Sequence, residues 1–219
     1  MAQNAGNAKN ILVGASPLFI SNLDVTSGSS YVENAEPGST AAGAFVSGES
    51  YTNTLNAITP STTFAYRNVG FTNNGLQITY NPTYDSVTVD QLLDTAKLFK
   101  SAMEVMIATE MSEGTLENVL IVFGQKKSTL SGGTLGLEAG ALGAAPTERQ
   151  LIAIGNAPTV SGPTTERVYY ARRVLSVQQS QFTLARNTPT TFPVTFRLLP
   201  DAAYTGSEYG KIIDRSWTA

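Results

Sequence analysis

Short segments in which apolar and polar residues alternate recur along this chain, and this spacing is typical of strands with one buried face. The clearest case is 190–199, where every second residue is large and apolar: Phe192, Val194, Phe196 and Leu198. Pro193 falls on the opposite face, which indicates an edge strand or a bulge. Further strands are expected at residues 10–14, 135–137, 150–154 and 166–175. The pattern predicts a mainly β protein.

Residues 69–89 are expected to form a tight hairpin followed by a second turn. The Asn-Asn-Gly run at 73–75 supplies residues that tolerate positive φ, as the turn of a hairpin requires. Apolar and polar residues then alternate from Leu76 to Tyr80. The Asn-Pro-Thr run at 81–83 should break this strand, and the alternation resumes at Val87.

One stripe of apolar residues at helical spacing predicts a short helix after residue 114. Its members fall at i, i+3, i+4 and i+7: Leu116, Val119, Leu120 and Phe123. Thr115 is a suitable N-cap and Gly124 a suitable stop, so the helix should be about two turns long. We expect the four apolar side chains to pack this helix against the sheet.

The composition is poor in charge, with 14% charged residues against about 25% in average soluble proteins. Ser, Thr, Asn and Gln supply the polarity, and 19 Gly and 10 Pro suit short strands and many turns. The formal net charge is -3, so the composition does not indicate a basic surface that would bind nucleic acid. Residues 1–10 are polar and do not show a charged segment followed by an apolar one, so no secretory signal is expected. Residues 11–20 are too short and too interrupted to span a bilayer, so no membrane association is expected.

Catalysis is not expected from this sequence. There is no Cys and no His, which excludes disulfides, Cys or His metal sites and the usual nucleophilic triads. Residues 206–211 resemble a phosphate loop, but Ile212 stands where a Mg²⁺-binding hydroxyl is needed, so a turn before a strand is favoured. A carboxylate-based hydrolase stays open as a minor alternative. No cofactor and no metal are predicted.

A single domain is expected over residues 1–219, with one long loop or arm at about 21–65. More than half of this arm is Ser, Thr, Gly, Asn or Pro, and its apolar residues have nothing nearby to pack against. Two interpretations remain: an insertion without fixed structure, or an arm that orders against a neighbouring molecule. The residues that would make such contacts are Tyr31, Phe45, Tyr51 and Leu55.

The order of these elements resembles that of the tail tube proteins of long-tailed bacteriophages. The resemblance covers residues 65–125 and 165–214, about half the chain, and depends on the order and spacing of several short runs. These runs are residues 69–75, 87–91, 114–119, 123–124 and 209–214.

The resemblance implies a β-sandwich or barrel subunit with one short flanking helix. Six copies would close into a ring whose inner strands form a barrel, and stacked rings would form the hollow tube through which DNA leaves the virion without specific binding. The implied partners are further copies, a tail terminator, baseplate or tail-tip proteins and a tape measure protein, with or without a sheath. Assembly would occur in the host cytoplasm, and the arm at 21–65 would contact the next ring.

The resemblance also bears on residues 89–111, which fit two secondary structures. Leu92, Phe99, Met103 and their apolar neighbours show helical spacing, and the composition favours helix. The resemblance implies a strand over 101–110, and we adopt it because tertiary context overrides propensity. Carboxylates facing the lumen would repel the phosphate backbone. The expected lumen or lumen-proximal residues are Asp85, Asp90, Glu104 and Glu110.

Besides the minor hydrolase alternative, two others remain at this point. One is a tube protein of related fold from a bacterial contractile secretion system, which is also structural. The other is a monomeric β-sandwich binding module, for instance for carbohydrate. The oligomeric state separates the binding module from both kinds of tube protein, because a binding module stays monomeric.

Overall fold

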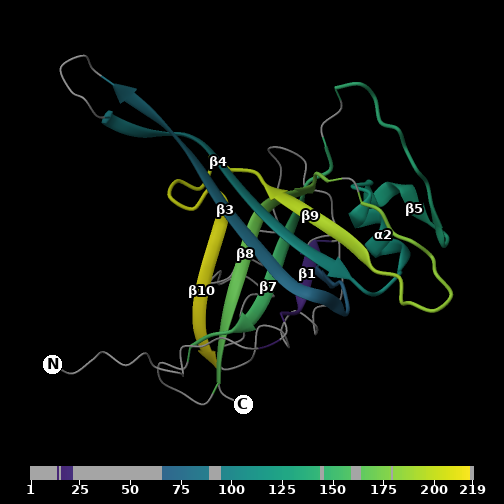
Figure 1. Ribbon diagram of the computed structural model, residues 1–219. Coiled ribbons are helices and arrows are strands. Elements are labelled where there is room, and N and C mark those ends of the chain that lie inside the picture. Colours follow the sequence, from purple (N-terminus) through teal and green to yellow (C-terminus); the bar gives the residue numbers. More distant parts are fainter. Residues whose placement is uncertain are drawn as a thin grey trace.

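The computed structural model describes residues 14, 16–21, 66–88, 95–143, 146–158, 164–178 and 180–217. These residues form an antiparallel sheet of eight strands in the order β2-β1-β7-β8-β9-β4-β3, with β10 also paired to β8 (Figure 1). The strands are β1 Leu18–Ser21, β2 Tyr66–Asn68, β3 Thr72–Thr88, β4 Thr95–Met111, β7 Arg149–Asn156, β8 Thr164–Ser176, β9 Phe192–Leu198 and β10 Gly210–Trp217. The smaller elements are the helix α2 Leu116–Val122, the 3₁₀ turn η3 Lys127–Thr129, and the paired strands β5 Leu130–Ser131 and β6 Thr134–Leu135. For the described residues, the prediction of a mainly β chain with one short helix is confirmed.

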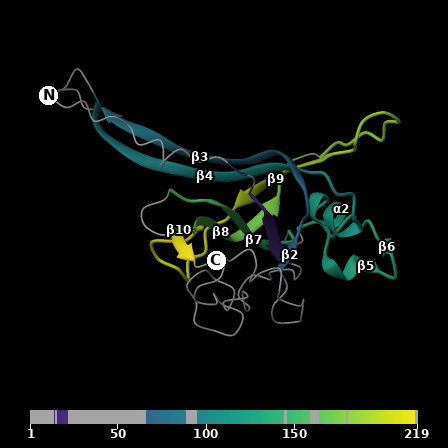
Figure 2. The same cartoon turned by 90° about the horizontal axis from the view of Figure 1, so that it is seen from below.

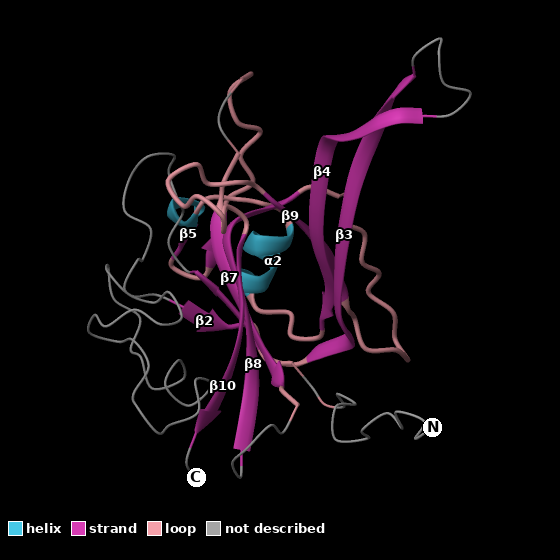
Figure 3. Cartoon of the chain, turned by 90° about the vertical axis from the view of Figure 1, so that its left-hand side faces the viewer, coloured by secondary structure: helices cyan, strands magenta, loops and turns pink. Residues whose placement is uncertain are grey.

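The sheet folds over on itself because two strands share one edge of β8. Residues 164–171 of β8 pair with β10, while residues 174–176 pair with β9. From β9 the sheet continues into β4 and β3, which cross in front of β7, β8 and β10 as a second layer (Figures 1 and 3). The core lies between these layers and includes Leu18, Ile20, Ile107, Leu151 and Phe196. This arrangement is consistent with a β-sandwich.

Strand β9 confirms the alternation predicted for residues 190–199. Phe192, Val194, Phe196 and Leu198 are all buried, and the residues between them are more exposed. Pro193 pairs with Glu110 of β4, whereas pairing with β8 begins only at Phe196. Pro193 therefore lies where β9 has one neighbouring strand, and the expectation of an edge position is confirmed.

The predicted helix is present as α2. The Thr115 side chain accepts a hydrogen bond from the Asn118 backbone N–H at 3.2 Å, and Gly124 follows the helix with a φ of 63°. Leu120 is buried and Val119 packs against the core, as expected. The expected burial of Leu116 and Phe123 is wrong, since each is 39% exposed. These two residues stand at the ends of the helix, and the buried face is completed by Asn118, Ile121 and Val122 instead.

The hairpin turn predicted at 73–75 is wrong. Residues 72–88 form one continuous strand, and 73–75 belong to a bulge in which the register shifts between Asn73 and Gln77. Asn74 and Gly75 do adopt positive φ, at 59° and 68°. The Thr109 hydroxyl of β4 donates a hydrogen bond of 2.8 Å to the Gly75 carbonyl within the bulge. The expectation that these residues tolerate positive φ was correct, but in the structure they form a bulge that bends the strand, and the chain does not reverse direction there.

The break predicted at 81–83 is also wrong, because β3 continues through Pro82, which lies opposite Met103. β3 is the last strand of the sheet, and proline is tolerated on such an edge when its nitrogen points away from the ladder. The strand predicted over 101–110 is confirmed by β4, so helical spacing does not decide the structure here. Of the strand expected at 10–14, only residue 14 lies within the described residues.

Three remaining strand expectations and one turn expectation can be compared with the structure. The strands predicted at 150–154 and 166–175 are confirmed by β7 and β8. The one predicted at 135–137 is shorter and shifted, as β6 Thr134–Leu135. Residues 201–207 form turns that lead into β10, which agrees with a turn before a strand at 206–211.

Candidate self-assembly surface

The β3–β4 pair extends well beyond the sandwich. β4 pairs with β9 only over residues 106–111, whereas it pairs with β3 along nearly its whole length. Residues 81–88 and 95–104 therefore form a two-stranded unit, which we call the distal ribbon. No third strand pairs with it among the described residues. Figures 1 and 2 show the distal ribbon projecting past the rest of the described chain.

The distal ribbon exposes large apolar side chains on both of its strands. Tyr84 is 58% exposed and Leu98 is 65% exposed, and Val87 and Phe99 are nearly half exposed. A two-stranded hairpin without a packed face is only marginally stable in water. Exposed apolar residues gathered on such an element are typical of a surface that another molecule covers.

Among the described strands, the long edges of β3 and β10 have no neighbouring strand, and the three-residue strand β2 ends the other side of the sheet. β3 ends the sheet on one side, and β10 pairs only with β8. Such edges present unpaired N–H and C=O groups that can pair with a further strand. Pro82 removes one donor from the β3 edge, so a partner strand has acceptors but no donor at that position.

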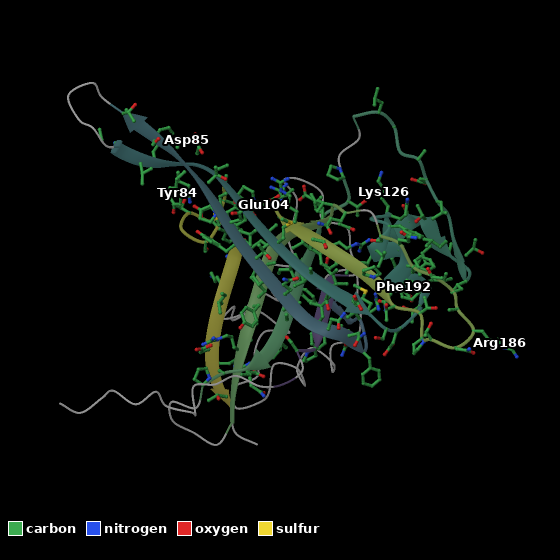
Figure 4. The ribbon with its side chains drawn as sticks, in the orientation of Figure 1. Tyr84, Asp85, Glu104, Lys126, Arg186 and Phe192 are labelled. Carbon is green, nitrogen blue, oxygen red and sulfur yellow. The ribbon has the colours of Figure 1, made fainter. Side chains whose placement is uncertain are left out.

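Three of the four predicted lumen residues lie on one face of the β3–β4 pair. Glu104 and Glu110 alternate on β4 with the buried residues Val105, Ile107 and Thr109, so both point away from the core. Glu104 lies opposite Asn81 of β3, and Asp85 falls on the same face as Asn81 because it is four residues further along that strand. Figure 4 shows Asp85 on the projecting part of the ribbon and Glu104 nearer its root. Asp90 lies outside the described residues.

This outward face also carries positive charge, which the sequence interpretation did not include. Arg197 of β9 lies opposite Met106, and its guanidinium is 3.6 Å from the Glu104 carboxylate. Lys97 lies opposite Val87, which shares the face of Asp85. The face is therefore mixed in charge with a slight acidic excess, and it is not uniformly acidic.

A buried asparagine joins α2 to the start of the β3–β4 layer. The Asn118 amide nitrogen donates to the carbonyls of Val69 and Glu113 at 2.9 and 2.8 Å. Its side-chain oxygen accepts a 2.7 Å bond from Arg67 of β2. Burial lowers the pKa of Arg67, while the nearby carboxylate of Glu117 opposes that shift. Sequence reasoning missed Asn118 because its partners are distant in the chain.

Charged contacts hold β10 and the turn before it against β8. Arg167 donates two hydrogen bonds to the Asp214 carboxylate, at 2.5 and 2.7 Å, which holds the pKa of Asp214 below its ordinary value. The buried guanidinium of Arg172 lies 3.5 Å from the centre of the Tyr204 ring and donates to the Ser207 carbonyl. These contacts position one open edge of the sheet.

The described residues include no cluster of three or more acidic side chains that could hold a metal ion. Within the same residues, no helix is long and apolar enough to cross a bilayer. The proposed arm contacts Tyr31, Phe45, Tyr51 and Leu55 all lie outside the described residues. The described candidates that the fold brings together are the distal ribbon and its carboxylate-bearing face.

Comparisons with known proteins leave the family of this chain open. No protein-family model matches the sequence, and no curated protein matches it.

Proposed function

We propose that this chain is the structural subunit of a bacteriophage tail tube. Copies associate side by side into six-membered rings, and the rings stack into a hollow tube through which DNA leaves the virion. The observation that carries this proposal is the distal ribbon, a two-stranded projection with exposed apolar side chains and an open edge. Among the described residues of a single copy, the ribbon has no neighbouring strand along its edge and no cover over its apolar side chains, and neighbouring copies would supply both.

The physical gain from association has two sources. Pairing of strands between copies satisfies backbone groups along the open edges, and closure of the ring leaves no edge exposed. Covering the half-exposed side chains of the ribbon, such as Tyr84 and Leu98, contributes on the order of 1 kcal/mol for each residue. Because the surfaces that meet are different parts of the chain, the contact is head-to-tail, and such contacts build rings or filaments.

In this assembly the outward face of β3 and β4 lines the lumen. Its polar residues and slight acidic excess suit a surface past which DNA slides, since phosphate contacts come mainly from Lys and Arg. The ion pair between Glu104 and Arg197 keeps the local field weak. At physiological salt the remaining repulsion extends only about 8–10 Å.

Light scattering combined with negative-stain electron microscopy tests the proposal. Purified protein, concentrated alone or with tail-assembly initiator proteins, is expected to form rings or tubes with a central channel. A mass that stays at 23.2 kDa under all these conditions would contradict the proposal and favour a monomeric binding module. The secretion-system alternative would be favoured if rings grew into tubes on the baseplate of a contractile secretion system but did not grow on phage tail-tip proteins.

A further inference from the structure

An apolar groove opens between the two layers of the sandwich at the root of the distal ribbon. It measures about 290 Å³, and its lining comes from β3 and β4 on one side and from β8, β10 and the preceding turn on the other. The main lining residues are Ile78, Tyr80, Val105, Tyr169, Tyr209 and Ile212. Ile78, Tyr80 and Ile212 are 41%, 65% and 67% exposed. The core is thus uncovered at this end.

The N-terminal part of the described chain, at Gly14 and Ser16, lies beside this groove. Gly14 and Ser16 line a neighbouring pocket together with Ile78 and Tyr169, and these last two residues also line the groove. Gly14 has a φ of 153°, and a side chain there would lie 2.6 Å from the Asn156 amide nitrogen. Gly14 is exposed, its positive φ favours glycine, and the nearest atoms belong to the Asn156 side chain.

The three residues before Gly14 are Ile11, Leu12 and Val13, an apolar run in an otherwise polar N-terminal segment. We propose that this run docks in the groove of its own chain and covers the exposed end of the core. The inference does not depend on the proposed tube function, because it concerns contacts within one copy.

Length and volume both fit this occupant. Three extended residues span about 10 Å, whereas the two-residue step from Ile78 to Tyr80 covers about 7 Å of strand. The run therefore reaches along the groove from Gly14. Loss of one buried leucine side chain leaves a cavity of about 150 Å³, so the groove has room for roughly two aliphatic side chains.

The short connection also favours the same chain over a second copy. A segment tethered a few residues from its site experiences an effective concentration in the millimolar range. A second copy at micromolar concentration competes poorly with that. Docking would brace the root of the ribbon, because Ile78 and Tyr80 belong to β3.

Cysteine cross-linking tests the inference directly, because the chain contains no Cys. The variant Leu12→Cys/Ile78→Cys is oxidised as dilute monomer and analysed on non-reducing gels. The matched control is Leu12→Cys/Leu142→Cys, since Leu142 is fully exposed in a loop after β6. We expect most of the first variant, and little of the control, to form an intramolecular disulfide. Equal cross-linking in the two variants, or dimers only, would overturn the inference.

A dye-binding measurement provides a second readout in the full-length chain. Leu12→Ser should increase binding of a hydrophobic dye, because the groove loses its cover, whereas Asn10→Ser should not. Circular dichroism checks that both variants keep the native strand content. Equal dye binding by the two folded variants would overturn the inference, and it would do so whether or not the protein forms tubes.

Discussion

The guanidinium of Arg197 lies 3.6 Å from the carboxylate of Glu104 and joins β9 to β4 on the outward face of the sheet. Glu104 is one of the carboxylates expected to line a lumen, so its charge is partly neutralised by its own chain. Both side chains are partly exposed, and exposed pairs of this kind contribute about 0–1 kcal/mol. Their main effect is on the charge of the face and not on stability.

A double-mutant cycle checks this assignment. Glu104→Gln, Arg197→Gln and the double variant should each unfold within about 1 kcal/mol of the wild type in denaturant melts. A coupling energy well above that value would contradict the description of an exposed, screened pair. The pair would then contribute substantially to the stability of the fold.

The stability contribution of α2 should be concentrated in Leu120. Leu120→Ala removes a buried side chain and should cost about 2–5 kcal/mol. Phe123→Ala should cost less, about 1–2 kcal/mol, because Phe123 is 39% exposed and its ring lies at the distance of a weak aromatic pair, 6.1 Å, from that of Phe182. Urea melts of the two variants measure the difference. Equal losses would show that Phe123 is buried more deeply than described.

Asn118 should be among the most sensitive polar residues in the chain. Asn118→Ala leaves the Val69 and Glu113 carbonyls and the Arg67 guanidinium without these bonds, so we expect a loss of about 2–4 kcal/mol. Ser112→Ala, at a nearby exposed position, should change the unfolding free energy by less than about 0.5 kcal/mol. If thermal or urea unfolding gave similar values for both, the buried network would have little energetic role.

The Arg167–Asp214 pair predicts a pH-dependent difference. The folded-state pKa of Asp214 is lowered from 3.8, so the pair stabilises the fold above that value and its contribution disappears as the pH falls through the lower folded pKa. Asp214→Asn should therefore cost up to about 1 kcal/mol at neutral pH. The gap between variant and wild type should narrow as the pH falls below 3.8 and close once the Asp214 carboxylate is protonated in the folded state. A gap that is independent of pH would show that the carboxylate charge is not responsible.

Local sequence was sufficient for the elements whose partners are close or whose pattern is unambiguous. The capped helix at Thr115 and the alternating strand from Phe192 to Leu198 were predicted with nearly correct boundaries. In both, the apolar spacing and the terminal residues indicate the same structure. The strand at 101–110 was less clear, because its apolar spacing also fits a helix, and pairing with β3 and β9 decides it.

The errors have a shared cause in contacts between distant parts of the chain. Asn74 and Gly75 tolerate positive φ in a hairpin turn and in a bulge alike, and only the position of β4 distinguishes the two. Pro82 breaks a central strand but is tolerated on an edge, and edge position depends on the whole sheet. Asn118 could not be identified as a buried anchor because its partners Arg67 and Val69 lie about 50 residues away.

The central claim is that copies associate through the open edge of the distal ribbon. Pro82 indicates which N–H groups of β3 point outward. The register shift between Thr83 and Tyr84 skips a residue on β4 and none on β3, so β3 keeps its alternation and the N–H of Tyr84 points outward too. Tyr84→Pro should remove that donor without breaking the ladder to β4, while Tyr84→Ala removes the side chain and keeps the donor. Circular dichroism verifies that both variants fold.

Sedimentation velocity over a concentration series of the wild type and these two variants is the most direct test. We predict that the wild type forms large species, that Tyr84→Ala does so only at higher concentration, and that Tyr84→Pro sediments as a folded monomer. A wild type that stays monomeric at every concentration, or a Tyr84→Pro variant that assembles as readily as Tyr84→Ala, would contradict the account.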